Sequence, residues 1–212
     1  MMFRRLFGGG SDKKEPERKP EHVWDLRPGD FLKLALVAPE GLSGAELQVA
    51  SVHAADFGGP HKVRRVLALE GGDGGPYTLW RDESDKVALG LEIQRPVVEQ
   101  LFDLDEFARL FDPDEPPNLT LQRQAELPQL AGWTAPVYRQ EAAHQAYLQR
   151  QDPAVTAVDS TLTDDAEEFD HYRLVGDRRR FAVEVAVFDG GRTEVTLVAL
   201  LPEAVIEEIW AA

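Results

Sequence analysis

Two segments of the sequence, one in the middle and one at the end, repeat the same pattern. Residues 87–102 read VALGLEIQRPVVEQLF, and residues 193–210 read TEVTLVALLPEAVIEEIW. In each, an apolar stretch typical of a strand precedes a proline, and a short amphipathic segment with a terminal aromatic follows it. We interpret this internal repeat as two related β-rich halves, each closed by a short helix that begins at the proline.

The composition indicates a folded protein without cysteine chemistry. The 212 residues are 43% hydrophobic and include four tryptophans, which suffices for one large or two small domains. The chain has no cysteine, and this excludes disulfides, thiolate nucleophiles and cysteine-ligated zinc. No run of about 18 apolar residues occurs, so no membrane-spanning segment is predicted.

Charge divides the chain into a basic tail and an acidic body. Residues 1–20 carry six Lys or Arg and three acids, although the whole chain has a formal net charge of −15. An acidic body repels the phosphates of nucleic acid, so no nucleic-acid partner is expected. Glycines at 8–10 and a charged, proline-punctuated run up to residue 20 predict a disordered tail.

The tip of this tail has the composition of a weak membrane anchor. It consists of Phe3, Arg4, Arg5, Leu6 and Phe7. On a helix the three apolar side chains share one face, beside two arginines that suit anionic lipid headgroups. We therefore predict a weak, reversible contact with a membrane surface.

Residues 21–112 are expected to form a β-rich domain, either barrel-like or a strongly bent sheet, with a terminal helix. Short alternating strands are predicted at 31–37, 46–54, 61–70, 77–81 and 86–94, separated by turns rich in glycine, proline and acids. Pro96 begins the helical segment. The acidic, proline-rich residues 112–117 mark the boundary with the second half.

Residues 118–212 are expected to form an α+β domain with a C-terminal hairpin and helix. For residues 134–150 a helix and a strand are both compatible with the sequence. Strands are predicted at 172–175, 180–188 and 192–201, the last two joined by an Asp-Gly-Gly turn. Trp210 extends the apolar face of the final helix and is expected to be buried there. The predicted fold class is thus α+β, with mainly antiparallel sheets in two halves.

No motif predicts a catalytic centre, a cofactor or a metal. The glycine-rich run 71–76 precedes a strand, whereas a phosphate loop requires a following helix. The five histidines lack zinc-site spacing, and no serine lies in a Gly-x-Ser-x-Gly elbow. The sequence therefore favours a non-enzymatic protein without a cofactor.

One basic cluster stands out in the acidic body. Arg178, Arg179 and Arg180 could contact the carboxylates or phosphates of a partner, because arginine forks bind both. The alternative is the end of a hairpin that balances the acids of residues 164–170.

Several short features resemble a known group of proteins. They are the Met-Phe-Arg-Arg-Leu-Phe tip, the charged linker, Leu26 to Asp30, Gly132-Trp133, and Phe169 to Tyr172. The layout resembles bacterial accessory proteins of phage-shock-protein-A-like envelope-stress gene clusters. The resemblance implies a membrane-side accessory role and carries over no catalytic residues.

Together these observations predict a cytoplasmic protein, peripheral to the inner membrane, that binds another protein and does not catalyse a reaction. The alternative is an enzyme or a small-ligand binder with its site in the cleft between the two halves. A deep cleft with convergent polar groups and perturbed carboxylates favours the alternative. An exposed flat patch favours the protein-binding role.

Overall fold

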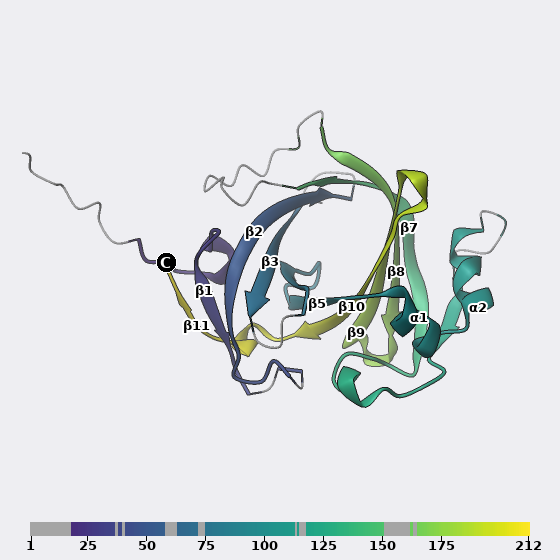
Figure 1. The fold of residues 1–212 in the computed structure, drawn as a ribbon, viewed down its shortest axis with the longest axis horizontal. Coiled ribbons are helices and arrows are strands. Elements are labelled where there is room, and N and C mark those ends of the chain that lie inside the picture. Colours follow the sequence, from purple (N-terminus) through teal and green to yellow (C-terminus); the bar gives the residue numbers. More distant parts are fainter. Residues whose placement is uncertain are drawn as a thin grey trace, which may run out of the picture.

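The computed structural model describes residues 18–212, apart from residues 37, 40, 58–62, 72–74, 113, 115–117, 151–161 and 163–164. This part of the chain contains eleven strands and two short α-helices (Figure 1). Neither helix is long and apolar enough to cross a bilayer. The predicted membrane tip and nearly all of the predicted disordered tail lie outside the described residues.

The strands fall into two meanders of similar layout. The first comprises β1 (Phe31–Leu34), β2 (Glu46–Asp56), β3 (Val63–Gly71), β4 (Tyr77–Arg81) and β5 (Val87–Ile93). The second comprises β6 (Thr120–Gln122), β7 (Val137–Gln149), β8 (Glu167–Gly176), β9 (Phe181–Phe188) and β10 (Thr193–Leu201). The helices α1 (Arg95–Leu101) and α2 (Leu104–Ala108) follow the first meander, and β11 (Ile206–Trp210) follows the second.

Two seams join these meanders into one closed antiparallel sheet. Along one seam β5 pairs with β10 over seven residue pairs. Along the other, Ala54–Asp56 of β2 pair with Tyr147–Gln149 of β7. The eight strands β2–β5 and β7–β10 therefore form a ring, while β1, β11 and β6 extend the sheet beyond it. In Figure 1 β2 and β7 curve upward from opposite sides and meet at the top.

The outer face of the ring is rich in leucine and valine. Because side chains alternate along a strand, neighbouring strands bring the same class of residue together on one face. Six fully buried outer-face residues are Leu67, Leu79, Leu89, Leu174, Val183 and Leu197. Each such side chain contributes about 1.5–3 kcal/mol when removed from water.

The segments outside the ring cover this leucine-rich face. Val98 and Leu101 of α1, with Phe102 and Phe107, belong to the same apolar cluster as the outer-face leucines. Trp133, in the connection to β7, stacks on Tyr77 of β4 with ring centroids 6.1 Å apart. The long connection between β5 and β7 is therefore part of the core.

The inner face of the ring carries small and polar side chains instead. Along β9, Ala182, Glu184 and Ala186 point inward, whereas Val183 and Val185 point outward. The inner face is thus enclosed by closure of the sheet, whereas leucines and the segments packed on them cover the outer face except along β7.

The predicted α+β fold with two helix-closed halves is wrong. The described chain is mainly β, with a single antiparallel sheet of eleven strands, and its α-helices contain only seven and five residues. Residues 134–150, left open between helix and strand, form the 13-residue strand β7. The alternating burial of β7 shows why: its long polar side chains face water while Tyr138, Gln140 and Ala146 are buried.

The sequence repeat corresponds to equivalent strands but to different continuations. The repeated apolar stretches are β5 and β10, which lie side by side in the sheet. After β5 the chain forms α1, but after β10 a short 3-10 turn, Glu203–Val205, leads into the strand β11. The predicted C-terminal helix is therefore wrong, because the edge of β1 offers backbone partners to a segment with β-branched and aromatic residues.

Trp210 also differs from its prediction. It is half-buried on β11 and stacks on Phe31 with ring centroids 5.6 Å apart. Its sequence counterpart Phe102 is only 1% exposed.

This difference predicts unequal effects of truncation. Phe102→Ala should lower the free energy of unfolding by about 3–5 kcal/mol, as expected for a fully buried aromatic. Trp210→Ala should cost only about 1 kcal/mol, close to the value of an aromatic pair. Denaturant unfolding of both variants checks this, and equal losses would show that β11 anchors the core as strongly as α1 does.

Candidate functional site

A cavity of about 570 Å³ lies inside the ring of strands. All eight strands of the ring contribute to its wall. Small inward-facing side chains leave the space open; they are Ala50, Ala68, Thr78, Ala186 and Thr196. The volume lies within the range of sites that hold small organic ligands.

The floor of the cavity is formed by Trp80. This residue lines the cavity and also belongs to a small apolar cluster on the inner face, with Ala88, Val175, Ala182, Val198 and Leu200. Gly90, on the neighbouring strand, makes room for the indole: a Cβ there would lie 2.8 Å from the Trp80 ring and 2.4 Å from Thr78 Oγ1. The glycine therefore sets the position of the floor.

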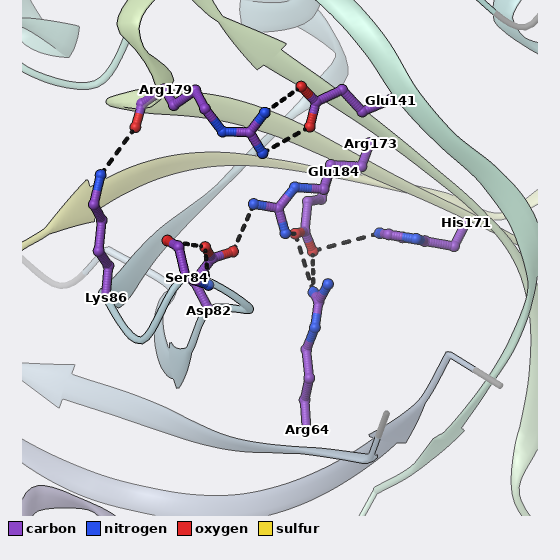
Figure 2. Close-up of polar contacts among 9 residues, drawn as sticks. All are labelled: Arg64, Asp82, Ser84, Lys86, Glu141, His171, Arg173, Arg179 and Glu184. Carbon is purple, nitrogen blue, oxygen red and sulfur yellow. Dashed lines mark hydrogen bonds and ion pairs between the residues drawn. The ribbon is translucent and has the colours of Figure 1, made fainter. Parts of the chain in front are cut away.

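A buried carboxylate, Glu184, connects opposite walls of the ring (Figure 2). Arg64 on β3 donates from Nη1 to both carboxylate oxygens, each at 3.0 Å. Arg173 on β8 donates to the same carboxylate at 3.3 Å. The three side chains are 8–13% exposed, so few water molecules compete for these contacts.

Asp82 extends this network toward the end of the ring. It follows β4 and accepts a hydrogen bond from Arg173 Nη2 at 2.6 Å. Ser84 holds the other oxygen of Asp82 through its backbone N–H and its hydroxyl, at 3.1 and 2.7 Å. Burial alone would raise the pKa of Asp82, but these hydrogen bonds and the charge of Arg173 lower it. The charges of Arg64, Arg173, Glu184 and Asp82 cancel.

The environment of Glu184 suits structure rather than proton transfer. Burial tends to raise its pKa, but Arg64, His171 and Arg173 together place the pKa far below the usual range of a glutamate. A general base at neutral pH needs a pKa near the working pH. Glu184 is therefore a permanent negative charge that orients its arginines.

Two buried rings line the cavity with nitrogen atoms that lack hydrogen bonds. The His171 side chain is 3% exposed; its Nε2 lies 3.5 Å from Glu184 without a hydrogen bond, and its Nδ1 has none either. The Trp80 Nε1–H is also buried without a partner. Phe57 packs edge-on against His171, with centroids 4.5 Å apart. Buried polar atoms are normally hydrogen-bonded, so these nitrogen atoms are exceptions within the cavity wall.

A second set of charged groups lies elsewhere on the cavity wall. Arg150 donates to both oxygens of Glu194 at 2.8 and 3.0 Å. Glu92 on β5 is half-buried, and its side chain makes no hydrogen bond or ion pair within the described residues. Burial, and then the charge of Glu194, raise the pKa of Glu92, and the charges of Arg150 and Arg192 oppose this only in part.

A serine and a histidine lie together on the wall formed by β2. Ser51 Oγ is 3.0 Å from His53 Nε2. Burial, and then the charge of Arg150, lower the pKa of His53, so the imidazole is neutral at pH 7. A neutral imidazole beside a hydroxyl can accept its proton.

The arginines predicted as a partner contact lie outside the cavity. They occupy the turn between β8 and β9, where Arg178 and Arg179 have positive φ values of 64° and 50°. Arg179 pairs with Glu141 of β7 at 2.6 and 2.9 Å (Figure 2). Arg180 lies 5.6 Å from the ring centroid of Phe181. They end a hairpin at the surface, and a partner contact there stays a prediction.

Sequence reasoning missed the residues that build the cavity. Arg64, Arg173, Glu184 and His171 come from three strands, and no sequence motif brings them together. A usable signal was present in β9, where a glutamate stands between Ala182 and Ala186 opposite a run of valines. When one face of a strand packs in the core, the opposite face normally carries large polar residues that meet water. Two alanines on either side of a single glutamate indicate instead that this opposite face is enclosed.

Comparison with known proteins does not assign a function to this cavity. No protein-family model matches the sequence, and no curated protein or solved structure is significantly similar to it. The function is therefore inferred from the geometry.

The network predicts a large and pH-dependent effect of Glu184→Gln. At neutral pH the amide leaves Arg64 with no charge partner in a buried site, which costs about 3–5 kcal/mol. Because folding lowers the pKa of Glu184, the stability it supplies is present above the unfolded value of 4.5 and is lost as the pH falls below it. The difference between wild type and variant should therefore shrink below pH 4.5.

Glu141→Gln is the matched control for this experiment. It breaks the exposed pair with Arg179, whose side chains are 37% and 63% exposed, and should cost less than about 1 kcal/mol. Urea unfolding from pH 7 to pH 3 measures both variants. Equal losses at pH 7 would contradict a structural role for the Glu184 network.

Proposed function

We propose that the protein binds a small molecule in the cavity enclosed by β2–β5 and β7–β10. The single observation that carries the proposal is the cavity wall, where the rings of His171 and Trp80, with buried nitrogen atoms that lack hydrogen bonds, lie beside a fixed charge network. Binding sites typically combine apolar walls with a few oriented polar groups. This corresponds to the sequence-based alternative of a ligand site between the two halves.

Preorganisation supports binding as the role of the charge network. Arg64 packs over Phe57, 3.9 Å from the ring centroid, while Glu184 fixes its guanidinium. Side chains already held in one position lose little entropy when a ligand arrives. The network thus presents a rigid wall at no further ordering cost.

The protein-binding role at a membrane face stays a separate prediction. Its main feature, the tip at residues 3–7, lies outside the described residues. Among the described residues the exposed large apolar side chains are Leu36, Val63, Leu104, Phe111 and Tyr147. They come from five different segments, so they give this role less support than the cavity gives to ligand binding.

Filling the cavity should abolish binding without unfolding the protein. Ala68→Phe and Ala186→Phe place a ring in the open space from opposite walls, β3 and β9. Compounds found by ligand-observed NMR and thermal shift on the full chain should bind each filled variant at least about tenfold more weakly, since the rings occupy their site. Ala143→Phe makes the same change at an exposed position of β7 and is the control.

Two results would contradict the proposal. One is that every bound compound keeps its affinity in folded Ala68→Phe and Ala186→Phe. The other is that no compound of a chemically diverse panel binds the folded wild-type protein at all.

A second candidate function is acyl transfer at Ser51. It is favoured by the 3.0 Å contact between the Ser51 hydroxyl, which lines the cavity, and the neutral His53 imidazole. In this reaction the Ser51 oxygen would attack an ester carbonyl of the bound molecule while His53 takes the hydroxyl proton. His53 would then return this proton to the departing alcohol as the ester C–O bond breaks, which leaves Ser51 acylated.

This candidate makes a distinct prediction. A fluorophosphonate should label the wild-type protein covalently, with Ser51 as the modified residue in the digested product. Ser51→Ala should abolish the label, whereas Ser43→Ala, at an exposed loop position, should keep it. Absence of label on the wild-type protein would leave binding as the sole proposed role.

A further inference from the structure

We infer that the ligand is a small organic cation, with its charged group at Glu92 and an aromatic or apolar body directed toward Trp80. This inference rests on the proposed function and specifies its ligand class. It follows from the charges, the burial and the hydrogen-bonding groups of the wall.

The cations that line the cavity are already neutralised. Arg64 is held by Glu184, and Arg150 is held by Glu194. His53 adds no charge at neutral pH, because burial and Arg150 lower its pKa. An anionic ligand would therefore have to displace a carboxylate from one of these arginines, inside a chain of net charge −15.

The anionic groups are not all neutralised. Glu70 and Glu92 line the cavity without an ion pair among the described residues. Glu70 is exposed. Glu92 is half-buried, and the charges of Arg150 and Arg192 offset only part of the effect of burial and of Glu194, since the pKa of Glu92 is raised. A ligand ammonium beside Glu92 offsets the remaining cost of burial, and the nearby Glu194 adds to the attraction.

The deeper wall determines the other end of the ligand. Trp80, Phe57, Phe169 and Val66 provide apolar surface. The Trp80 Nε1–H is a donor without an acceptor, and the ring nitrogens of His171 also lack hydrogen bonds. A hydroxyl on a ring can accept from the Trp80 N–H and can also accept from, or donate to, a ring nitrogen of His171. An aromatic amine with a ring hydroxyl therefore combines all of the features that the wall recognises.

Matched probes of equal shape and opposite charge test the inference. Tyramine and 3-(4-hydroxyphenyl)propionate share a phenol and a chain of similar length, but one ends in an ammonium and the other in a carboxylate. Tryptamine and indole-3-propionate form a second such pair. Titration of the full chain is followed through the indole N–H resonances, with Trp80→Phe used to assign Trp80.

The expected result is that at least one amine binds about tenfold or more tightly than its matched acid, as charge-assisted hydrogen bonding implies. Glu92→Gln should weaken that amine by about tenfold. Glu208→Gln, which removes the same charge from the exposed strand β11, should leave the affinity unchanged.

Other outcomes separate the ligand class from the proposed function. Acids that bind as well as their amines, or amine binding that survives Glu92→Gln, would overturn the inference of a cationic ligand. If neither amine binds but another compound does and is blocked by Ala186→Phe, the cation inference fails while the cavity keeps its function. If no compound is blocked by Ala186→Phe, the proposed function fails as well.

Discussion

Closure of the sheet is the constraint on which the rest of the structure depends. A sheet that pairs its first and last ring strands must bury one face inside the ring, whatever side chains that face carries. Here the leucines lie on the outer face, and α1, α2 and the long connection before β7 pack against them. The inner face combines alanine, threonine and a few charges with the rings of Trp80, Phe57 and Phe169. The usual arrangement, with the aliphatic core inside a barrel, is thus reversed, and the small inner residues leave the cavity open.

Charged residues inside a closed sheet are tolerable only as a complete set. Glu184 joins Arg64 from β3 to Arg173 from β8, and Arg173 continues to Asp82, so that each ion has a partner of opposite charge. A half-complete set would leave a buried charge, which is far more costly than an apolar replacement of the whole set. A network of this kind is therefore better explained by the specificity and fixed geometry it gives the wall than by stability.

Local sequence patterns predicted the positions of most strands, but they did not predict which distant strands pair. Alternation and turn residues sufficed for β3, β4, β9 and β10 because both signals lie within about ten residues of each strand. The β2–β7 seam joins residues roughly ninety positions apart, and no local signal encodes it. The same holds for Arg64 and Glu184, 120 residues apart. For residues 206–210 the sequence predicted a helix, but the pattern of five residues fits a helix and a strand equally. The structure forms a strand there because the segment pairs with the open edge of β1.

The two seams differ in strength, and the cavity borders the weaker one. Seven residue pairs join β5 to β10, whereas three join β2 to β7. Leu148 and Arg150 line the cavity on one side of the short seam, and His53 and Phe57 line it on the other. A ligand that touches both sides adds contacts where the backbone supplies fewest. Because a ligand that binds only the folded state stabilises it by mass action, occupancy of the cavity and closure of the ring are thermodynamically linked. The fold thus places its shorter seam beside the proposed binding site.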